Sequence, residues 1–127
     1  MDKLEYIPGD LAFHYIPKTI IKKYVKVYVC STQNALSLED MDGNLYDYIG
    51  ELYPIPLTPE ILEKNGWREE KGDYINDNYH IKLCEKIDDY SAYKVVNDTI
   101  VWLRDVKSVS NLQHLIFGLG LNSEMEV

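Results

Sequence analysis

The chain has 127 residues, 46% of them hydrophobic, which predicts one folded domain and argues against a disordered segment. Its net charge of −8 argues against general binding to nucleic-acid phosphates. No apolar run approaches the ~20 residues of a membrane-spanning helix, and the first residues lack the apolar core of a signal peptide. We therefore expect a cytoplasmic protein without membrane contact, in which Cys30 and Cys84 are free thiols.

The N-terminal half, residues 1–53, has the pattern of a β-rich segment. Valine alternates with tyrosine and lysine between Lys22 and Cys30, which is typical of a strand with one buried face. Asp42-Gly43-Asn44 predicts a hairpin turn, and Gly50 predicts a bulge in the strand that follows. The expected strands cover residues 11–15, 22–30, 35–38 and 45–53. We expect that this half can close as a small barrel.

Residues 54–67 predict a short helix with signals at both ends. Thr58 is a good N-cap, and the proline after it fits the first helical position, where no N–H is needed. Gly66 can adopt the left-handed conformation that ends a helix, so that Trp67 can pack back on Leu62. A helix of about two turns is unstable alone in water. We therefore expect it to connect two sheet segments and to dock its apolar side chains on them.

Residues 68–127 predict an antiparallel meander followed by a helix. The expected strands cover residues 67–70, 74–75, 79–84, 92–96 and 100–103. Ser108 is the expected N-cap of the last helix and Gly120 its end, and the acidic tail after it is expected to fray. The sequence thus predicts an α+β fold over residues 1–127, mostly of antiparallel strands, with a short central helix and a C-terminal helix.

Two segments carry a resemblance to a known family. The first is Pro-Ile-Pro-Leu-Thr-Pro-Glu-Ile-Leu-Glu-Lys-Asn-Gly-Trp at residues 54–67, and the second is Leu-Gln-His-Leu-Ile-Phe at residues 112–117. Together they resemble segments of a family of small uncharacterised proteins from gut bacteria, their phages and their mobile elements. The likeness covers residues 53–121. Because that family has no assigned activity, it implies a fold neighbourhood and a mobile-element origin, and it transfers no catalytic residue.

The sequence contains no arrangement of residues that predicts catalysis. Side chains between Asp40 and Glu51 have the spacing of a calcium loop, but the glycine that the loop needs at its sixth position is Leu45. His80 and Cys84 would lie ~13 Å apart on one strand, too far to share a metal ion. A cysteine with a distant histidine stays open as a thiol nucleophile, against a packed, inert thiol. We therefore expect a non-catalytic protein without a metal or cofactor.

Seven acidic residues and no basic one lie between Glu39 and Glu63. Negative charge speeds the encounter with a basic partner, and tyrosine side chains supply affinity once they are buried. We therefore predict that the protein binds another protein, such as a basic host protein that handles nucleic acids. The alternative is a solvated hairpin whose charge only keeps the chain in solution. The residues predicted to bind a protein partner are Asp42, Tyr46, Asp47, Tyr48, Glu51 and Tyr53.

A second hypothesis is a small barrel that binds single-stranded nucleic acid. The segment from Leu11 to Leu38 has four lysines and no acidic residue, and tyrosines lie close to those lysines. Lysine contacts phosphates and tyrosine stacks on bases, which suits this use. The alternative is a solvated strand whose lysines protect a sheet edge from pairing. The residues predicted for nucleic-acid binding are Lys18, Lys22, Lys23, Tyr24, Lys26 and Tyr28.

Overall fold

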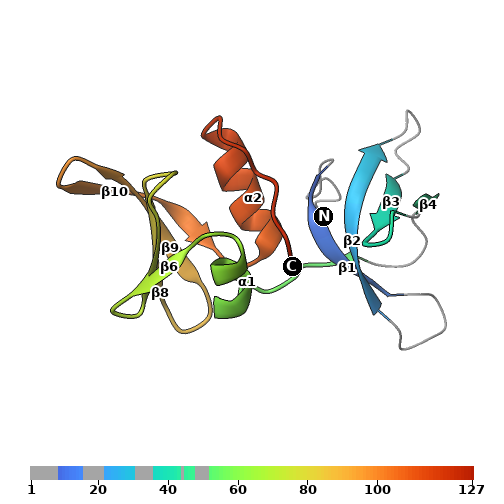
Figure 1. Cartoon of the computed structure of the whole chain (residues 1–127), viewed down its shortest axis with the longest axis horizontal. Helices are drawn as coiled ribbons and strands as arrows, with labels where there is room; N and C mark the ends of the chain where they lie inside the picture. Colours follow the sequence, from blue (N-terminus) through green and yellow to red (C-terminus); the bar gives the residue numbers. More distant parts are fainter. Residues whose placement is uncertain (1–8, 16–21, 31–35, 44, 48–51) are drawn as a thin grey trace. The chain divides into compact units, whose positions relative to one another are not determined.

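The computed structural model describes residues 9–15, 22–30, 36–43, 45–47 and 52–127. The chain divides into two compact units, Met1–Ile55 and Pro56–Val127, each built around one antiparallel sheet (Figure 1). The described residues confirm the predicted α+β class, with mostly antiparallel strands and two helices. The single domain predicted over 1–127 stays a prediction, and the predicted β-rich half lies within the first unit.

The first unit contains a five-stranded sheet. Its strands are β1 (Leu11–Tyr15), β2 (Lys22–Cys30), β3 (Leu36–Asp40), β4 (Leu45–Asp47) and β5 (Leu52–Tyr53), in the order β4-β3-β2-β1-β5. The alternation predicted for β2 is confirmed, because Val25 and Val27 are fully buried whereas Tyr24 and Lys26 are exposed. The two valines form a small core with Leu38 of β3. Burial of this valine face holds the central strands together.

Three predictions for this unit need correction. The segment 45–53 forms two strands rather than one, because β4 pairs with β3 at one edge of the sheet, whereas Leu52 pairs with His14 at the other edge. β2 is the central strand, so its lysines do not protect a sheet edge. Among the described strands, no pairing between β4 and β5 closes the predicted barrel. The bulge predicted at Gly50 lies outside the described residues.

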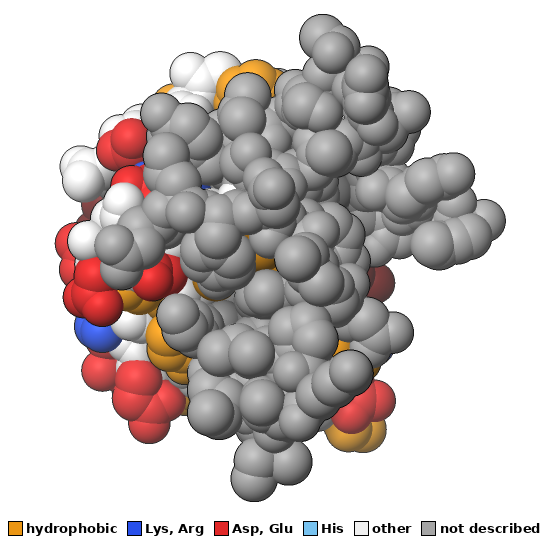
Figure 2. Space-filling model, turned by 90° about the vertical axis from the view of Figure 1, so that its right-hand side faces the viewer, with side chains coloured by type: hydrophobic (Ala, Val, Ile, Leu, Met, Phe, Trp, Pro, Cys, Tyr) orange, Lys and Arg blue, Asp and Glu red, His pale blue; other side chains and the backbone are white. Residues whose placement is uncertain are grey.

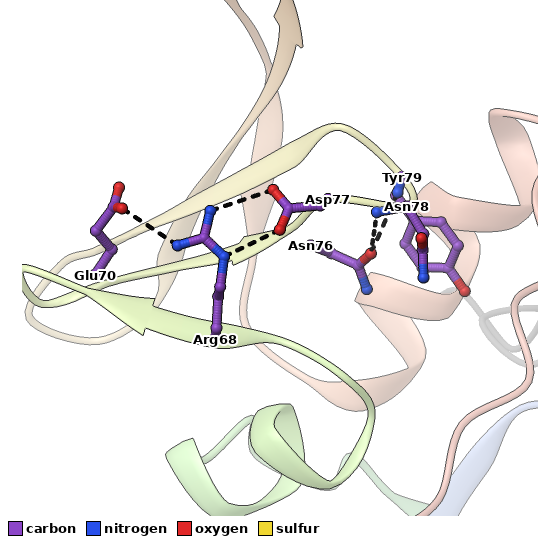
Figure 3. Close-up of polar contacts among 6 residues, drawn as sticks. All are labelled: Arg68, Glu70, Asn76, Asp77, Asn78 and Tyr79. Atoms are coloured by element: carbon purple, nitrogen blue, oxygen red, sulfur yellow. Dashed lines mark hydrogen bonds and ion pairs between the residues drawn. The ribbon is translucent and has the colours of Figure 1, made fainter.

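The second unit contains the predicted antiparallel meander. Its strands are β6 (Arg68–Glu70), β7 (Asp73–Asn76), β8 (Ile81–Glu85), β9 (Tyr90–Val96) and β10 (Thr99–Val106), in the order β10-β9-β8-β7-β6. Its helices are α1 (Pro59–Lys64) and α2 (Val109–Gly118). Tyr79 and His80 precede β8 instead of belonging to it. The buried Asn76 side chain explains this, because it accepts hydrogen bonds from the N–H groups of Asn78 (3.0 Å) and Tyr79 (3.2 Å) and so holds a turn (Figure 3).

α1 begins and ends where the sequence predicts. Thr58 Oγ1 accepts a hydrogen bond from the N–H of Ile61 at 3.2 Å and so caps the first turn. At the other end Gly66 has a φ of 89°, and the N–H of Trp67 donates to the C=O of Leu62 at 3.0 Å. This is the Schellman arrangement, and its usual apolar contact is possible because Leu62 and Trp67 are both buried. Local signals therefore define where this helix begins and ends.

α2 supplies buried side chains to one face of the second sheet. Ser108 Oγ accepts a hydrogen bond from the N–H of Asn111 at 3.1 Å, and Gly120, with a φ of 77°, follows the helix end, as predicted. Leu112 and Ile116 are buried, and Figure 1 shows both helices on the same side of this sheet. The buried apolar strand residues are Tyr74, Ile81, Leu83, Tyr90, Ala92 and Val106. No helix of the described second unit covers the opposite face, here called the open face.

The acidic tail is hydrogen-bonded to the second unit, so the predicted fraying is wrong. The side-chain amide of Asn65 donates to the C=O of Glu126 and accepts from the N–H of the same residue, both at 2.8 Å. Tyr79 Oη donates to the C=O of Asn122, also at 2.8 Å. Asn65 therefore serves the tail as a neighbouring strand would, while its own backbone N–H still closes α1.

Candidate interaction surface

The structure separates the acidic residues that the sequence predicts for protein binding. Asp42 is exposed in the turn that joins β3 to β4, where Gly43 N–H donates to the C=O of Asp40, and this confirms the predicted hairpin. β4 carries two more of the predicted residues, Tyr46 and Asp47. Tyr53 lies on β5, at the opposite edge of the sheet, about four strand spacings of ~4.8 Å away. The remaining predicted residues lie outside the described ranges: Tyr48 and Glu51.

The lysine-rich strand β2 lies in the middle of the first sheet. The ring of Tyr24 is stacked on Phe13 of β1, with centroids 4.8 Å apart, so one face of the ring is covered. Lys26 lies 4.0 Å from the carboxylate of Glu39, which compensates part of its charge. The other predicted residues on this strand are Lys22, Lys23 and Tyr28, whereas Lys18 lies outside the described residues. A platform for bases needs open ring faces and uncompensated lysines, and the described side chains offer little of either.

The described side chains assemble neither a metal site nor an activated thiol. Within the described ranges, no group of three or more His, Cys, Asp or Glu side chains could hold a metal ion. The thiol of Cys84 is partly buried, and this burial and the neighbouring Asp73 carboxylate raise its pKa. A thiolate nucleophile requires the opposite shift. The geometry at Cys84 therefore suits a packed thiol.

An exposed ion cluster links β6 to the turn after β7 (Figure 3). Arg68 donates from two nitrogens to the two carboxylate oxygens of Asp77, at 3.0 and 3.2 Å, and from the third to Glu70 at 3.2 Å. The hydrogen bond from Arg68 lowers the pKa of Asp77, and the two carboxylates raise the pKa of Arg68. All three side chains are more than half exposed. The cluster therefore connects neighbouring elements and leaves no charge unpaired for a ligand.

The end of the β9–β10 hairpin extends beyond the rest of the second sheet. β8 pairs with β9 only as far as Lys94, which lies opposite Val101, so residues 95–100 form a two-stranded ribbon around the turn at Asn97 and Asp98. Figure 1 shows this ribbon projecting from the sheet. β10 is also the edge strand, and no described strand pairs with its outer side. The ribbon therefore lacks the neighbours that stabilise the other strands.

Apolar side chains lie on both faces of β10 at the base of this ribbon. Ile100 and Trp102 lie on the open face, opposite Val95 and Tyr93 across the hairpin, and Val101 lies on the other face. Ile100, Val101 and Trp102, here named the hairpin patch, are 50%, 50% and 57% exposed. Single exposed apolar residues are common on protein surfaces, whereas consecutive ones on an unpaired edge indicate an interaction site.

A polar network borders the hairpin patch on the open face. The carboxylate of Asp105 accepts a hydrogen bond from Ser91 Oγ at 2.8 Å and lies 3.2 Å from Lys86 Nζ. The hydrogen bond from Ser91, followed by that from Lys86, lowers the pKa of Asp105. Lys86 also lies 3.5 Å from Asp89. An apolar centre beside paired polar groups is the usual arrangement of a protein–protein interface.

Outside residues 95–102, the exposed large apolar side chains of the described residues are not consecutive in the chain: Tyr24, Met41, Tyr53, Ile87, Phe117 and Leu119. Among the side chains coloured in Figure 2, acidic groups predominate over basic ones on the face shown, in agreement with the net charge of −8. Within the described residues no helix is long and apolar enough to cross a membrane. The sequence predicts a strand over residues 100–103 and gives no sign that it is a surface site, since an Ile-Val-Trp-Leu run has the pattern of a buried strand.

The resemblance of residues 54–67 and 112–117 to small proteins of gut bacteria and phages remains an expectation from the sequence. On the described surface, the hairpin patch is the strongest candidate for a functional site. No protein-family model, curated protein or solved structure matches this chain.

Proposed function

We propose that this chain is a non-catalytic interaction protein that binds another protein chain through the hairpin patch. The observation that supports this is the exposure of Ile100, Val101 and Trp102, at 50%, 50% and 57%, on the edge strand β10, whose outer side pairs with no described strand. Tryptophan is enriched among the residues that dominate binding energy, and an open strand edge adds backbone hydrogen bonds to a partner. Both sources of affinity coincide at this patch.

The charge and the bulge that could prevent β10 from pairing with another strand lie at the two ends of the hairpin patch, and neither lies within it. Natural edge strands carry charges, prolines or bulges that prevent pairing. In β10 the bulge falls between Trp102 and Arg104, and Asp98 lies in the turn before the strand. The three apolar residues between these positions are left without protection. An edge without such features along its apolar residues is suited to pairing with another chain.

The nucleic-acid alternative receives less support from the described residues. Phe13 covers one face of Tyr24, and Glu39 compensates Lys26 on the strand that this alternative needs. A mobile-element origin is supported by the sequence resemblance alone. Action on a basic host protein is supported by the acidic charge alone. The hairpin patch carries the proposal independently of either.

A site-specific crosslinking experiment tests the proposed function. A photoreactive phenylalanine analogue replaces Val101 in the patch or, as a matched control, Ile87, an apolar residue that is 99% exposed in the turn before β9. In an extract of the cells that express the chain, the probe at 101 should crosslink one defined protein, and the probe at 87 should not. Adding Trp102→Ala should abolish the product from position 101. Equal products from both positions, or a product that survives Trp102→Ala, would overturn the proposal.

A further inference from the structure

We propose that the side chains that hold the C-terminal tail, residues 122–127, form a binding site for an extended segment of another protein. In this structure the tail occupies that site, here named the tail-binding site and defined by Lys64, Asn65, Tyr79 and Gln113. The favoured occupant has small or apolar side chains at every second position and neutral or basic side chains between them. This inference is independent of the hairpin patch.

The tail-binding site contacts the main chain of the tail. The Asn65 side chain is hydrogen-bonded to both the N–H and the C=O of Glu126, as a residue of a neighbouring strand would be. The other bonds reach C=O groups of the tail: Tyr79 donates to Asn122 at 2.8 Å, Gln113 to Ser123 at 3.2 Å and Lys64 to Val127 at 3.0 Å. Within the described second unit, none of the hydrogen bonds that join the tail to other elements uses a tail side chain. Because every peptide carries these main-chain groups, the site is suited to segments of other sequences.

The side chains of the tail alternate between the protein and the solvent, which is the period of an extended segment with one covered face. An occupant therefore needs small or apolar side chains only at the inward positions. Two of the outward residues are glutamates in a chain of net charge −8, so neutral or basic outward side chains would meet less repulsion. The inward residues, which are partly buried, are Ser123, Met125 and Val127, and the outward ones, which are exposed, are Asn122, Glu124 and Glu126.

Contacts that do not involve the tail hold the groups of the tail-binding site in place. The side-chain amide of Asn65 also donates to the C=O of Ile61 at 2.7 Å, and its backbone N–H closes α1. The N–H of Tyr79 donates to Asn76, and its ring lies edge-on to the buried Trp67, with centroids 6.4 Å apart. Release of the tail therefore leaves these donors and acceptors arranged for another segment, which lowers the entropic cost of binding it.

The tail is an occupant that a second peptide can replace. Its bonds to Lys64, Asn65 and Tyr79 are exposed to solvent, where each hydrogen bond has a small net effect on stability. The loss of conformational freedom in the ordered tail opposes this effect. A free segment of the same kind therefore competes with the tail for the site.

An NMR titration of the full chain with a capped peptide of residues 121–127 tests the inference, with the side-chain amide signals of Asn65 and Gln113 as the measure of occupancy. Glu126→Pro in the chain removes the N–H that Asn65 accepts, and so releases the tail without changing the site. The peptide should bind this chain at least about tenfold more tightly than wild type, where the tail competes at a high effective concentration. The peptide with Glu124→Lys and Glu126→Lys should bind the released chain no less tightly.

Matched variants locate the binding at the tail-binding site. In the Glu126→Pro chain, Asn65→Asp keeps an acceptor for the peptide N–H but loses the donor for its C=O, so the affinity read from Gln113 should fall at least about tenfold. Asn78→Asp makes the same change in an exposed turn and should leave the affinity unchanged. If the Glu126→Pro chain does not fold, Met125→Asp releases the tail instead, because it places a charge on the inward face.

Three results would contradict the inference. The first is a chain with a released tail that does not bind the peptide, the second is equal affinity for the released and the wild-type chains, and the third is an affinity that survives Asn65→Asp. Each of these leaves the crosslinks from position 101 unaffected, so the hairpin patch is tested separately.

Discussion

The end of α1 allows a paired test of backbone strain. Gly66 has a φ of 89°, and an added Cβ would meet nothing within 4 Å, so Gly66→Ala introduces strain without a clash. A left-handed conformation costs an ordinary residue about 1–2 kcal/mol. Gly118 ends α2 without a positive φ and also has nothing within 4 Å, so Gly118→Ala should stabilise the unit by about 0.5–1 kcal/mol. The same substitution thus has opposite expected signs at two helix ends.

Urea denaturation followed by tryptophan fluorescence measures both effects in the second unit, since both tryptophans, Trp67 and Trp102, lie within it. With a denaturant slope of about 1 kcal/mol per molar urea, Gly66→Ala should lower the midpoint by about 1–2 M, and Gly118→Ala should raise it by about 0.5–1 M. Gly66→Val should lower it further, because a β-branched residue is more strained at positive φ. Equal midpoints for Gly66→Ala and wild type would refute the role of Gly66 in ending α1.

Two further predictions concern buried and paired groups in the same unit. Trp67 is 3% exposed, so Trp67→Ala should cost about 3–5 kcal/mol of unfolding free energy, and Trp67 emission in a Trp102→Phe background should resist quenching by iodide. Ser91 and Lys86 lower the pKa of Asp105, so this carboxylate stabilises the folded unit above its ordinary pKa, and that contribution is lost as pH falls through the lowered value. Ser91→Ala should raise the pKa of Asp105 in an NMR titration; an unchanged midpoint would assign the shift to another group.

The sequence predicted the elements whose signals are local. Thr58 and Gly66 define α1 within nine residues, and the cap and the Schellman bonds depend only on neighbours along the chain. The alternation of Val25 and Val27 is equally local, because the period of two follows from strand geometry. The positions of these features therefore do not depend on which strands pair with one another.

Pairing partners and edge positions could not be predicted, because they depend on contacts between distant segments. The segment 45–53 was expected as one strand, but its two ends pair with β3 and β1 on opposite edges of the sheet. This separates Asp42 from Tyr53, although the sequence placed both in one acidic run. The prediction that the C-terminal tail frays was wrong for the same reason, because the tail is held by Asn65, 61 residues earlier in the chain. Composition alone favoured a frayed end.

The hairpin patch is the clearest example of a feature that depends on contacts between distant segments. Ile100, Val101 and Trp102 would be core residues in a central strand, and a one-dimensional pattern does not tell a central strand from an edge. The meander leaves β10 as the last strand, and β8 ends its pairing at Lys94, so topology converts a core-like sequence into a surface. An exposed apolar run on a sheet edge favours association in water. A partner that covers it resolves this conflict between sequence and exposure.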